Sequence, residues 1–261
     1  MEPRSYNILG SVAIVNFSDD ITFSEKKKFA QKIMENNKVV KTVLEKSGNF
    51  KGRLRKMQTK HLAGEKTKEV LYRENGCVFR FDVDETYFSP RLSHERNEVA
   101  SMIKKGEEVF VMFAGVGPFS IVIAKNSSVK KVVSNEINRV ANKYAKLNVE
   151  LNNVKDKVEI VPGDVKRVAK KLNLEGRKFS TIVMPRPRLK DSFLPEAFML
   201  SKKGTKIIYY DFTPVEEIDK IVEKIKGEAK KAKKKVKILN VKRAGEIAPY
   251  KIRLRVDFKV V

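Results

Sequence analysis

Between residues 93 and 234, short apolar runs alternate regularly with longer segments in which apolar residues recur at helical spacing. Short apolar runs, which predict buried β-strands, lie at 108–113, 129–134, 157–161, 179–184 and 205–210. Between these runs, apolar residues recur at the spacing of an amphipathic helix, over 94–104, 118–125, 138–151, 165–172, 191–201 and 214–234. Ser93 precedes the first helix and is expected to cap it. Strand–helix alternation of this length predicts an α/β domain with a doubly wound, mostly parallel sheet.

The chain after this alternating region has a different pattern. From 250 to 260, apolar residues occupy every second position and charged residues occupy most of the others. This predicts a half-exposed strand, antiparallel to its neighbour and at or near the sheet edge. The Lys-rich run 216–237 suits either a nucleic-acid-binding tail or an amphipathic helix with a solvated Lys face. Ile221 and Ile225 belong to a set of apolar residues at helical spacing, which favours the helix.

The first 85 residues predict a smaller α+β module. The run 7–16 is predicted to form one strand, and 22–36 a helix that begins with a capping box between Thr22 and Glu25. Shorter apolar runs follow, separated by glycine-containing loops at 47–53 and 62–66; the runs lie at 39–44, 69–72 and 77–82.

Composition indicates the kind of partner. The 261 residues include 56 Lys and Arg against 32 Asp and Glu, and the formal charge of +24 indicates a polyanion. Nucleic acid is favoured over a membrane, because an apolar stretch of about 20 residues is missing and the Lys residues are spread over many segments. The basic stretch 48–65 is either a solvated loop or a phosphate contact. We expect two domains, over 1–85 and 86–261.

Cysteine and histidine are scarce. The chain has one cysteine, Cys77, and two histidines, His61 and His94, so neither an intrachain disulfide nor a structural zinc site is expected. The N-terminus fits neither a signal peptide nor a membrane span. We therefore expect a cytoplasmic protein that uses no membrane and no metal.

The first strand of the second domain leads into a glycine turn, FAGVGPFS at 113–120. Its two glycines can let the backbone approach a ligand at the carboxyl edge of the sheet, where the next helix begins. Ser120 replaces the third glycine of a dinucleotide fingerprint, which disfavours NAD. Glu136, after the second strand, is placed to bind ribose hydroxyls, and Asp164, after the third, to bind an exocyclic amine. Each feature alone is commonly a turn or a cap; together they indicate an S-adenosylmethionine site.

Several motifs together resemble the archaeal tRNA (guanine-37-N1)-methyltransferase family, with its wyosine-pathway relatives that transfer an aminocarboxypropyl group. They are YFSPRLSHERNEVASMI at 87–103, VFVMFAGVGPFSIVIAK at 109–125, NEIN at 135–138, GDV at 163–165 and a proline-containing motif after the fourth strand. The resemblance, from about residue 6 to the C-terminus, implies a class I methyltransferase (Rossmann-like) domain preceded by a small RNA-facing module. It implies S-adenosylmethionine as cofactor and tRNA as partner, and we expect a monomer. Some members carry a further N-terminal domain, which we expect this chain to lack.

The resemblance also assigns roles to individual residues. Glu95 would be the general base that takes the proton from guanine N1; without the resemblance it is an ordinary helix acid paired with a Lys. Arg55 would contact the guanine oxygen, with Arg53 and Arg91 as alternatives, and Arg91 could equally neutralise a phosphate. The residues expected around the cofactor are Tyr87, Arg91, Phe113, Ala114, Gly115, Gly117, Glu136, Asn138, Asp164, Met184 and Pro185.

Two positions depart from the family pattern. Val111 stands where the family has an acidic residue at the end of the first strand, so one polar contact beneath the cofactor is absent. Pro185-Arg186-Pro187 replaces an Asn-Leu-Pro motif; it keeps the second proline, Pro187, as a catalytic-site residue and loses the Asn that would contact the guanine edge. Backbone carbonyls around the start of the motif would substitute as acceptors, or the side chain of Arg186 or Arg188 as a donor.

The sequence therefore predicts an S-adenosylmethionine-dependent tRNA methyltransferase that acts on N1 of guanosine 37. Aminocarboxypropyl transfer in wyosine synthesis and methylation of a tricyclic wyosine precursor are the alternatives within enzymes, and the altered motif is a reason to test them. The alternative from another class is a non-catalytic RNA-binding protein that retains a cofactor fold, for which Val111 and Pro185 are the support.

Overall fold

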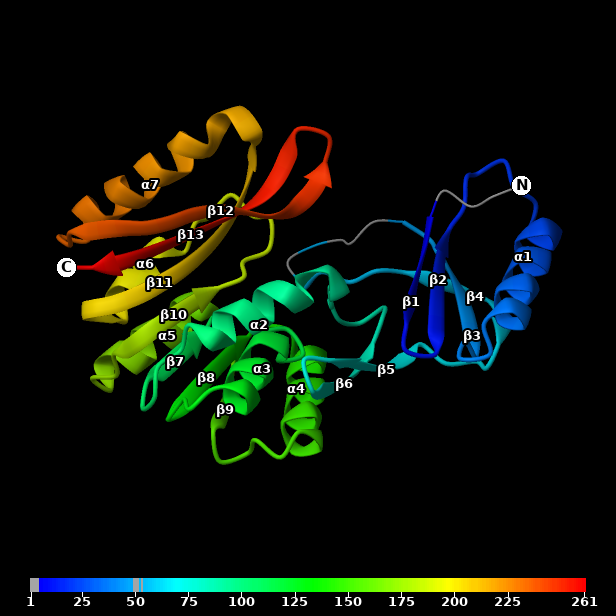
Figure 1. Ribbon diagram of the computed structural model, residues 1–261, viewed down its shortest axis with the longest axis horizontal. Helices are drawn as coiled ribbons and strands as arrows, with labels where there is room; N and C mark the ends of the chain where they lie inside the picture. The colour runs from blue at the N-terminus through cyan, green and yellow to red at the C-terminus, as the bar shows by residue number, and fades with distance from the viewer. Residues whose placement is uncertain (1–4, 49–51, 53) are drawn as a thin grey trace.

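The computed structural model describes residues 5–48, 52 and 54–261, which form a larger and a smaller lobe (Figure 1). The larger lobe is built on a seven-stranded sheet in the order β12-β13-β11-β10-β7-β8-β9. The five strands from β11 to β9 are parallel, whereas β13 and β12 are added antiparallel, which confirms the predicted α/β sheet. The strands are β7 (Glu108–Val111), β8 (Lys131–Glu136), β9 (Val158–Pro162), β10 (Phe179–Met184), β11 (Ser201–Pro214), β12 (Val236–Ala248) and β13 (Lys251–Val260).

Helices cover both faces of this sheet (Figure 1). The side chains of β7 explain why: Val109 and Val111 pack in one apolar cluster, and Phe110 and Met112 in another, because successive side chains of a strand point to opposite faces. The first cluster includes residues of α2 (Ser93–Ser101), α3 (Pro118–Asn126) and α4 (Arg139–Leu151). The second includes residues of α5 (Val165–Leu174), α6 (Leu194–Met199) and α7 (Ile218–Lys231).

The smaller lobe is a four-stranded sheet with one helix against it. The strands follow the order β1-β2-β3-β4, and α1 (Phe23–Asn36) contacts β3 and β4. The predicted capping box is confirmed, since Glu25 accepts a hydrogen bond from the Thr22 backbone N–H at 3.0 Å while the Thr22 hydroxyl accepts from the Glu25 backbone N–H at 3.4 Å. The strands are β1 (Ser5–Leu9), β2 (Val12–Asn16), β3 (Thr42–Lys46) and β4 (Thr59–Gly64).

Two predictions for the smaller lobe were wrong. The run 7–16 is not one strand but two, β1 and β2, which pair antiparallel with Leu9 opposite Val12. Gly10 makes the turn with a φ of +56°, and a Cβ at this position would lie 2.1 Å from the carbonyl oxygen of Leu71, so only glycine fits. The predicted loop at 62–66 is also partly strand, because β4 pairs along β3 up to Gly64.

A two-stranded hairpin, β5 (Glu69–Glu74) and β6 (Cys77–Asp82), joins the lobes. Its buried side chains, among them Phe79 and Phe81, belong to the apolar cluster of α2, α3 and α4. Two asparagines of α4 bind the backbone of β6: Asn152 accepts from the N–H of Val78 at 2.8 Å and donates to its carbonyl, and Asn148 does the same for Arg80. The domain boundary near residue 85 stays a prediction.

The C-terminal strand matches the prediction in part. β13 is antiparallel to β11 and near the sheet edge, as predicted, and β12, which the sequence pattern did not reveal, lies outside it. Its charged face is exposed at Lys251 and Lys259, whereas Arg255 and Asp257 are 1% and 2% exposed, so the half-exposed face was wrong at these two positions. They are buried because they bind each other and because Arg255 also donates to Glu98 of α2.

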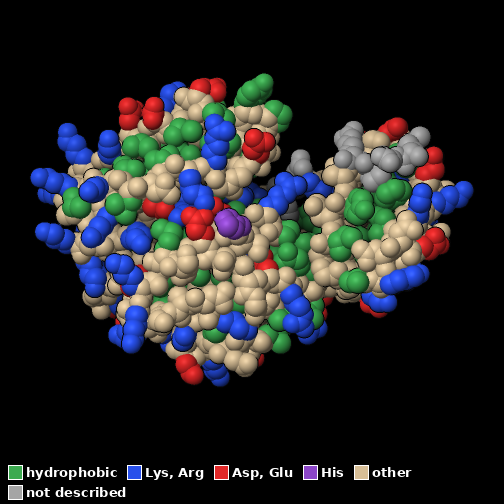
Figure 2. Space-filling view, viewed as in Figure 1, with side chains coloured by type: hydrophobic (Ala, Val, Ile, Leu, Met, Phe, Trp, Pro, Cys, Tyr) green, Lys and Arg blue, Asp and Glu red, His purple; other side chains and the backbone are tan. Residues whose placement is uncertain are grey.

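The region between β11 and β12 is the predicted amphipathic helix. A short 3-10 turn, η2 (Val215–Glu217), leads into α7, whose Ile221 and Ile225 are buried while most of its Lys residues are exposed; Lys224 instead pairs with the buried Asp211. Lys and Arg side chains cover much of the larger lobe in Figure 2. Among the described residues, no helix has the length and apolar character needed to cross a membrane. The same residues contain no group of three His, Cys, Asp or Glu side chains that could hold a metal ion.

Candidate active site

A cavity of about 590 Å³ opens at the carboxyl ends of β7, β8 and β10. The chain order reverses between β7 and β10, which is where doubly wound sheets place their ligands. The cavity brings together residues from both lobes and from both ends of the chain. Of the predicted site residues, those that line it are Arg55, Tyr87, Phe113, Ala114, Gly115, Glu136, Asn138, Pro185 and Pro187.

The turn after β7 and the carboxylate after β8 form one wall. Phe113 and Gly115 have φ angles of +56° and +58°, so the backbone turns sharply where β7 ends. The Gly115 N–H donates to one oxygen of Glu136 at 2.8 Å, and the Asn138 N–H donates to the other at 2.7 Å. Burial raises the pKa of Glu136, and these backbone hydrogen bonds partly oppose the shift. The wall therefore presents an acceptor held in a fixed orientation.

Asn138 fixes the position of this wall relative to the segment before Tyr87. Its side-chain oxygen caps α4 by accepting from the N–H groups of Val140 and Ala141. Its amide nitrogen donates to the carbonyl of Glu85 at 2.8 Å. Asn138 lines the cavity as predicted, but its amide group is engaged in these structural contacts.

Arg55 and Tyr87 form the opposite side. The Arg55 guanidinium lies over the Tyr87 ring, 4.5 Å from its centroid, and both side chains line the cavity. Arg55 reaches this place from the basic stretch between β3 and β4, so the smaller lobe contributes directly to the site. Of the two alternatives, Arg53 lies outside the described residues, and Arg91 is exposed on the 3-10 turn η1 (Pro90–Leu92) and does not line the cavity.

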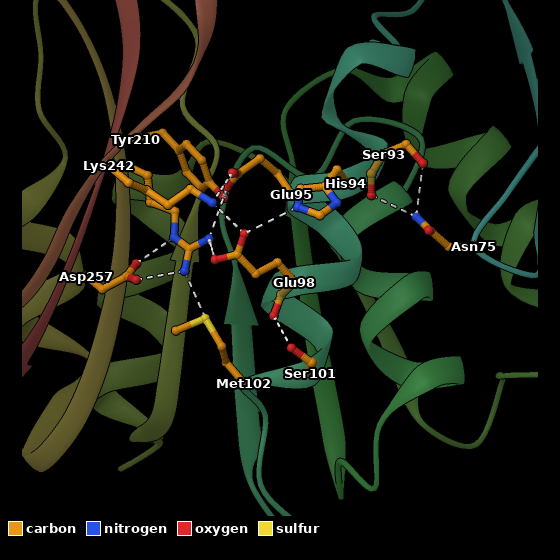
Figure 3. A network of polar contacts seen from close by, with 11 residues as sticks. Asn75, Ser93, His94, Glu95, Glu98, Ser101, Met102, Tyr210, Lys242 and Asp257 are labelled. Atoms are coloured by element: carbon orange, nitrogen blue, oxygen red, sulfur yellow. Dashed lines mark hydrogen bonds and ion pairs between the residues drawn. The ribbon is translucent and has the colours of Figure 1, made fainter.

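Glu95 lies one side chain away from the cavity, in a buried polar network (Figure 3). The hydroxyl of Tyr210, which does line the cavity, donates to Glu95 at 2.9 Å. Arg255 donates to the same carboxylate oxygen at 3.1 Å, and Lys242 pairs with the other oxygen at 2.9 Å. The pKa of Tyr210 is raised well above its ordinary value by burial and by the charge of Glu95. Glu95 is thus neither a surface acid nor a cavity-lining one, and it reaches the cavity through Tyr210.

The loop after β10 is held by Arg186, which is 3% exposed. Its guanidinium pairs with Asp211 and donates to the carbonyls of Leu189 and Asp191. Asp211 also accepts a hydrogen bond from the Tyr209 hydroxyl at 2.6 Å. Burial raises the pKa of Tyr209. Arg186 therefore shapes the loop, whereas Arg188 is an exposed cation on the cavity rim.

Three other residues that were expected around the cofactor do not line the cavity, and neither does Val111, which was expected beneath it. Asp164 is the N-cap of α5 and accepts from the Lys166 N–H at 2.9 Å. Gly117, at φ +89°, immediately precedes α3, and Met184, the last residue of β10, is fully buried in the cluster of α5, α6 and α7. Val111 is likewise fully buried, in the cluster of α2, α3 and α4. One oxygen of Asp164 caps the helix, and the expected contact of its carboxylate with an exocyclic amine stays a prediction.

Sequence reasoning missed several residues of the site. Arg96 lines the cavity and forms a buried ion pair with Glu74. Tyr210 lies on β11, and Ile247 and Arg253 come from the β12–β13 hairpin. The sequence could have indicated one of them, because Arg96 is a charged residue that directly follows Glu95 in the motif YFSPRLSHERNEVASMI. The hairpin residues carry no local signal because only the antiparallel pairing brings them over the cavity.

Comparison with known proteins gives two family matches. Residues 70–239 match the model described as TRM5/TYW2 methyltransferase domain. Residues 1–67 match the model described as TYW2 N-terminal domain. The two matches together cover almost the whole chain.

Individual relatives agree with these models. The chain is 36% identical to the tRNA (guanine(37)-N(1))-methyltransferase Trm5b of Pyrococcus abyssi, over 99% of this chain and 75% of the relative, and the crystal structure of that protein superposes with a TM-score of 0.86. It is 32% identical to the tRNA (guanine(37)-N(1))/4-demethylwyosine(37)-methyltransferase Taw22 of Nanoarchaeum equitans, over 98% of this chain and 100% of the relative. Trm5 of Methanocaldococcus jannaschii in complex with adenosine is 28% identical, with a TM-score of 0.82, over 98% of this chain and 74% of that one.

Proposed function

The chain belongs to the TRM5/TYW2 methyltransferase family, and we propose that it transfers the methyl group of S-adenosylmethionine to N1 of guanosine 37 in tRNA. One observation carries this proposal: a single cavity joins the Glu136 carboxylate, held on a glycine turn, to the Arg55–Tyr87 pair of the other lobe. The Glu136 carboxylate is suited to bind a nucleoside, and the Arg55–Tyr87 pair is suited to bind a planar base. A cofactor and an extruded purine can thus meet in one enclosed space.

The residues present fit S-adenosylmethionine. Glu136 lines the cavity with a carboxylate that its neighbours orient by two backbone hydrogen bonds, so it can accept from ribose hydroxyls. Gly115 suits the turn because its φ of +58° is a backbone conformation that residues with a side chain rarely adopt. Phe113 and Ala114 supply an apolar surface for an adenine ring. When bound, the cofactor supplies an electrophilic methyl group on a sulfonium centre.

On the substrate side, the protein must remove one proton from N1 of guanine and stabilise the negative charge that develops on the oxygen. We assign the second task to Arg55, whose guanidinium already lies in the cavity. We assign the first to Glu95 acting with Tyr210. The Tyr210 oxygen would accept the N1 proton while its own proton moves along the existing hydrogen bond to Glu95.

The partner is tRNA, and the charge of +24 supports a large phosphate contribution to binding. The logarithm of the tRNA affinity is expected to fall linearly with the logarithm of the salt concentration, which a titration at several salt concentrations measures. A flat response would contradict a phosphate-dominated interface. We propose further that the protein works in the cytoplasm as a monomer.

A labelling experiment tests the reaction. Unmodified tRNA is incubated with the protein and with cofactor labelled in the methyl group or, separately, in the carboxyl group, and the digested nucleosides are identified by mass. Methyl label in 1-methylguanosine at position 37 is expected. Absence of both labels from every tRNA tested would favour a non-catalytic RNA-binding protein.

A second candidate is action on a wyosine precursor. Three observations favour it: the Pro185-Arg186-Pro187 motif, the match of residues 1–67 to a TYW2 N-terminal domain, and the full-length similarity to a relative named for both guanosine 37 and 4-demethylwyosine 37. In the same experiment, methyl label that enters only tRNA already carrying a tricyclic base would support this candidate. Carboxyl label would instead identify aminocarboxypropyl transfer.

A further inference from the structure

The turn of the β12–β13 hairpin carries a large aromatic side chain that is mostly exposed to solvent. Tyr250 is 83% exposed, and it occupies the second position of a two-residue turn, Pro249–Tyr250, between the paired residues Ala248 and Lys251. An exposed aromatic ring of this extent gains no stability from burial. The fold itself therefore gives no reason for a tyrosine at this position.

Turn chemistry gives no reason either. Tyr250 has a φ of +58°, and a proline followed by a residue of positive φ is the pattern of a type II turn, whose second position favours glycine or asparagine. The conformation is held from outside the hairpin, because the Tyr250 carbonyl accepts a hydrogen bond from the Val215 N–H at 3.1 Å. A tyrosine in a strained and fixed position, with its ring in solvent, is typical of a residue kept for binding.

The hairpin extends to the candidate active site. Ile247 and Arg253, on its two strands, line the cavity, and the Arg253 guanidinium lies 5.4 Å from the centroid of the Phe212 ring. In Figure 1 the end of the hairpin projects beyond the sheet on the side that faces the smaller lobe. In Figure 2 a notch separates the two lobes there, and Lys and Arg side chains gather at its base. Residues 243–253 include three basic residues, Arg243, Lys251 and Arg253, and one acidic residue, which suits a phosphate backbone.

We propose that Tyr250 stacks on a nucleotide of the anticodon loop next to the base that enters the cavity. This inference rests on the proposed function, and it adds an RNA contact on the C-terminal hairpin. Extrusion of a base removes a stacking partner from each of its neighbours, which leaves a π-face open at the rim of the site. An exposed aromatic ring beside that rim restores the stacking without reading the sequence, since every base has a π-face.

The absence of tryptophan from the chain permits a direct test. Tyr250→Trp creates a single fluorescent reporter in the hairpin, and Leu174→Trp creates a matched one at the end of α5, where Leu174 is 87% exposed and just precedes β10 at the amino edge of the sheet. Addition of an anticodon stem-loop is expected to quench the hairpin reporter and to leave the α5 reporter unchanged. Two further stem-loops each carry one abasic residue, directly 5′ or directly 3′ of the target nucleotide, and one of the two should abolish the quench. Equal quenching of the two reporters would overturn the inference. So would a quench that persists with both abasic stem-loops.

Steady-state kinetics provides the second measurement. Tyr250→Ala is expected to raise KM for tRNA about 5- to 50-fold with little change in kcat, whereas Tyr250→Phe should restore the wild-type KM because it keeps the ring. Tyr250→Gly should behave as Tyr250→Ala does although glycine suits the turn, which separates lost stacking from lost folding. An unchanged KM in Tyr250→Ala, with methylation still observed, would refute the hairpin contact and leave the proposed function intact. No methylation by the wild-type protein would refute the function itself.

Discussion

The two sides of the cavity are built in different ways. The cofactor side, as we propose it, consists of residues 113–115 and 136–138, and its central hydrogen bond, from Gly115 to Glu136, joins residues 21 positions apart. The base side, as we propose it, includes Arg55 and Tyr210, and it depends on contacts such as Tyr210 to Glu95, which are 115 positions apart. The cofactor side is therefore a local product of two adjacent strand ends, whereas the base side exists only once the whole molecule has folded.

This difference predicts that the two sides can be damaged separately. Changes on the cofactor side should alter cofactor affinity and leave tRNA affinity unchanged. Changes on the base side should alter the chemical step or the fold and leave cofactor affinity unchanged. The three experiments below follow that division, from the largest expected effect to the smallest.

Glu95→Gln should lower the single-turnover rate of methyl transfer by about 10²–10⁴-fold, because an amide cannot take up the proton. Tyr210→Phe should also slow the step if the proton passes through the hydroxyl that now separates Glu95 from the cavity. Rapid-quench kinetics with saturating cofactor and tRNA measures both. Calorimetry serves as the control, since both variants should bind cofactor as the wild type does. A wild-type rate for Glu95→Gln would show that another group takes the proton.

Arg186→Met should destabilise the folded protein by about 3–5 kcal/mol, because it leaves Asp211 buried without its main cation. The pKa of Asp211 is held below its ordinary value, against burial, by Arg186 and by its hydrogen bonds from Tyr209 and Phe212. Urea unfolding measures the change. Arg188→Met is the matched control: it removes an exposed cation from the same loop and should change stability by only about 0.5 kcal/mol. Equal stability of the two variants would mean that Arg186 does not hold the loop.

Glu136→Ala should weaken cofactor binding by about 1–3 kcal/mol, the size of a lost charge-assisted hydrogen bond. Binding needs the ionised carboxylate, and the pKa of Glu136 lies above its ordinary value of 4.5 because of burial. Cofactor affinity should therefore be constant at high pH and fall as the pH drops through this raised pKa. Calorimetry over a pH series checks the trend, and Glu136→Gln should lack it. A wild-type pH profile in Glu136→Gln would assign the titration to another group.

The same division explains what the sequence could predict. The glycine turn and Glu136 each follow a predicted strand, so strand and helix patterns alone brought them to one sheet edge, whereas Asn138 came from the family resemblance and its N-cap role from the structure. Glu95 came from the family resemblance, but its partners did not. Arg255 is 160 positions away, on a strand whose charges looked solvent-exposed. A charge that alternates with apolar residues indicates solvent only when no opposite charge lies across from it, and periodicity does not contain that information.

The prediction of secondary structure from the sequence failed where tertiary contacts determine the local conformation. Gly10 interrupts an apolar run that otherwise predicts one strand, and the close approach of the Leu71 carbonyl requires glycine at this turn. β12 was missed because most of its side chains are exposed and its apolar residues do not alternate regularly with polar ones. Its conformation is imposed by pairing with β13. Edge strands of this kind leave little trace in a hydrophobic pattern.

The two asparagines of α4 that bind β6 also protect the protein against aggregation through an open strand edge. Residues four apart in a helix rise by about 6 Å, and residues two apart in a strand by about 6.7 Å, so Asn148 and Asn152 match the repeat of Arg80 and Val78. Each amide offers a donor and an acceptor, as a neighbouring strand does, and the helix therefore imitates a strand along β6. Unpaired strand edges recruit foreign strands and start aggregation. This edge is closed by side chains rather than by a third strand, which protects the joint between the lobes without widening its sheet.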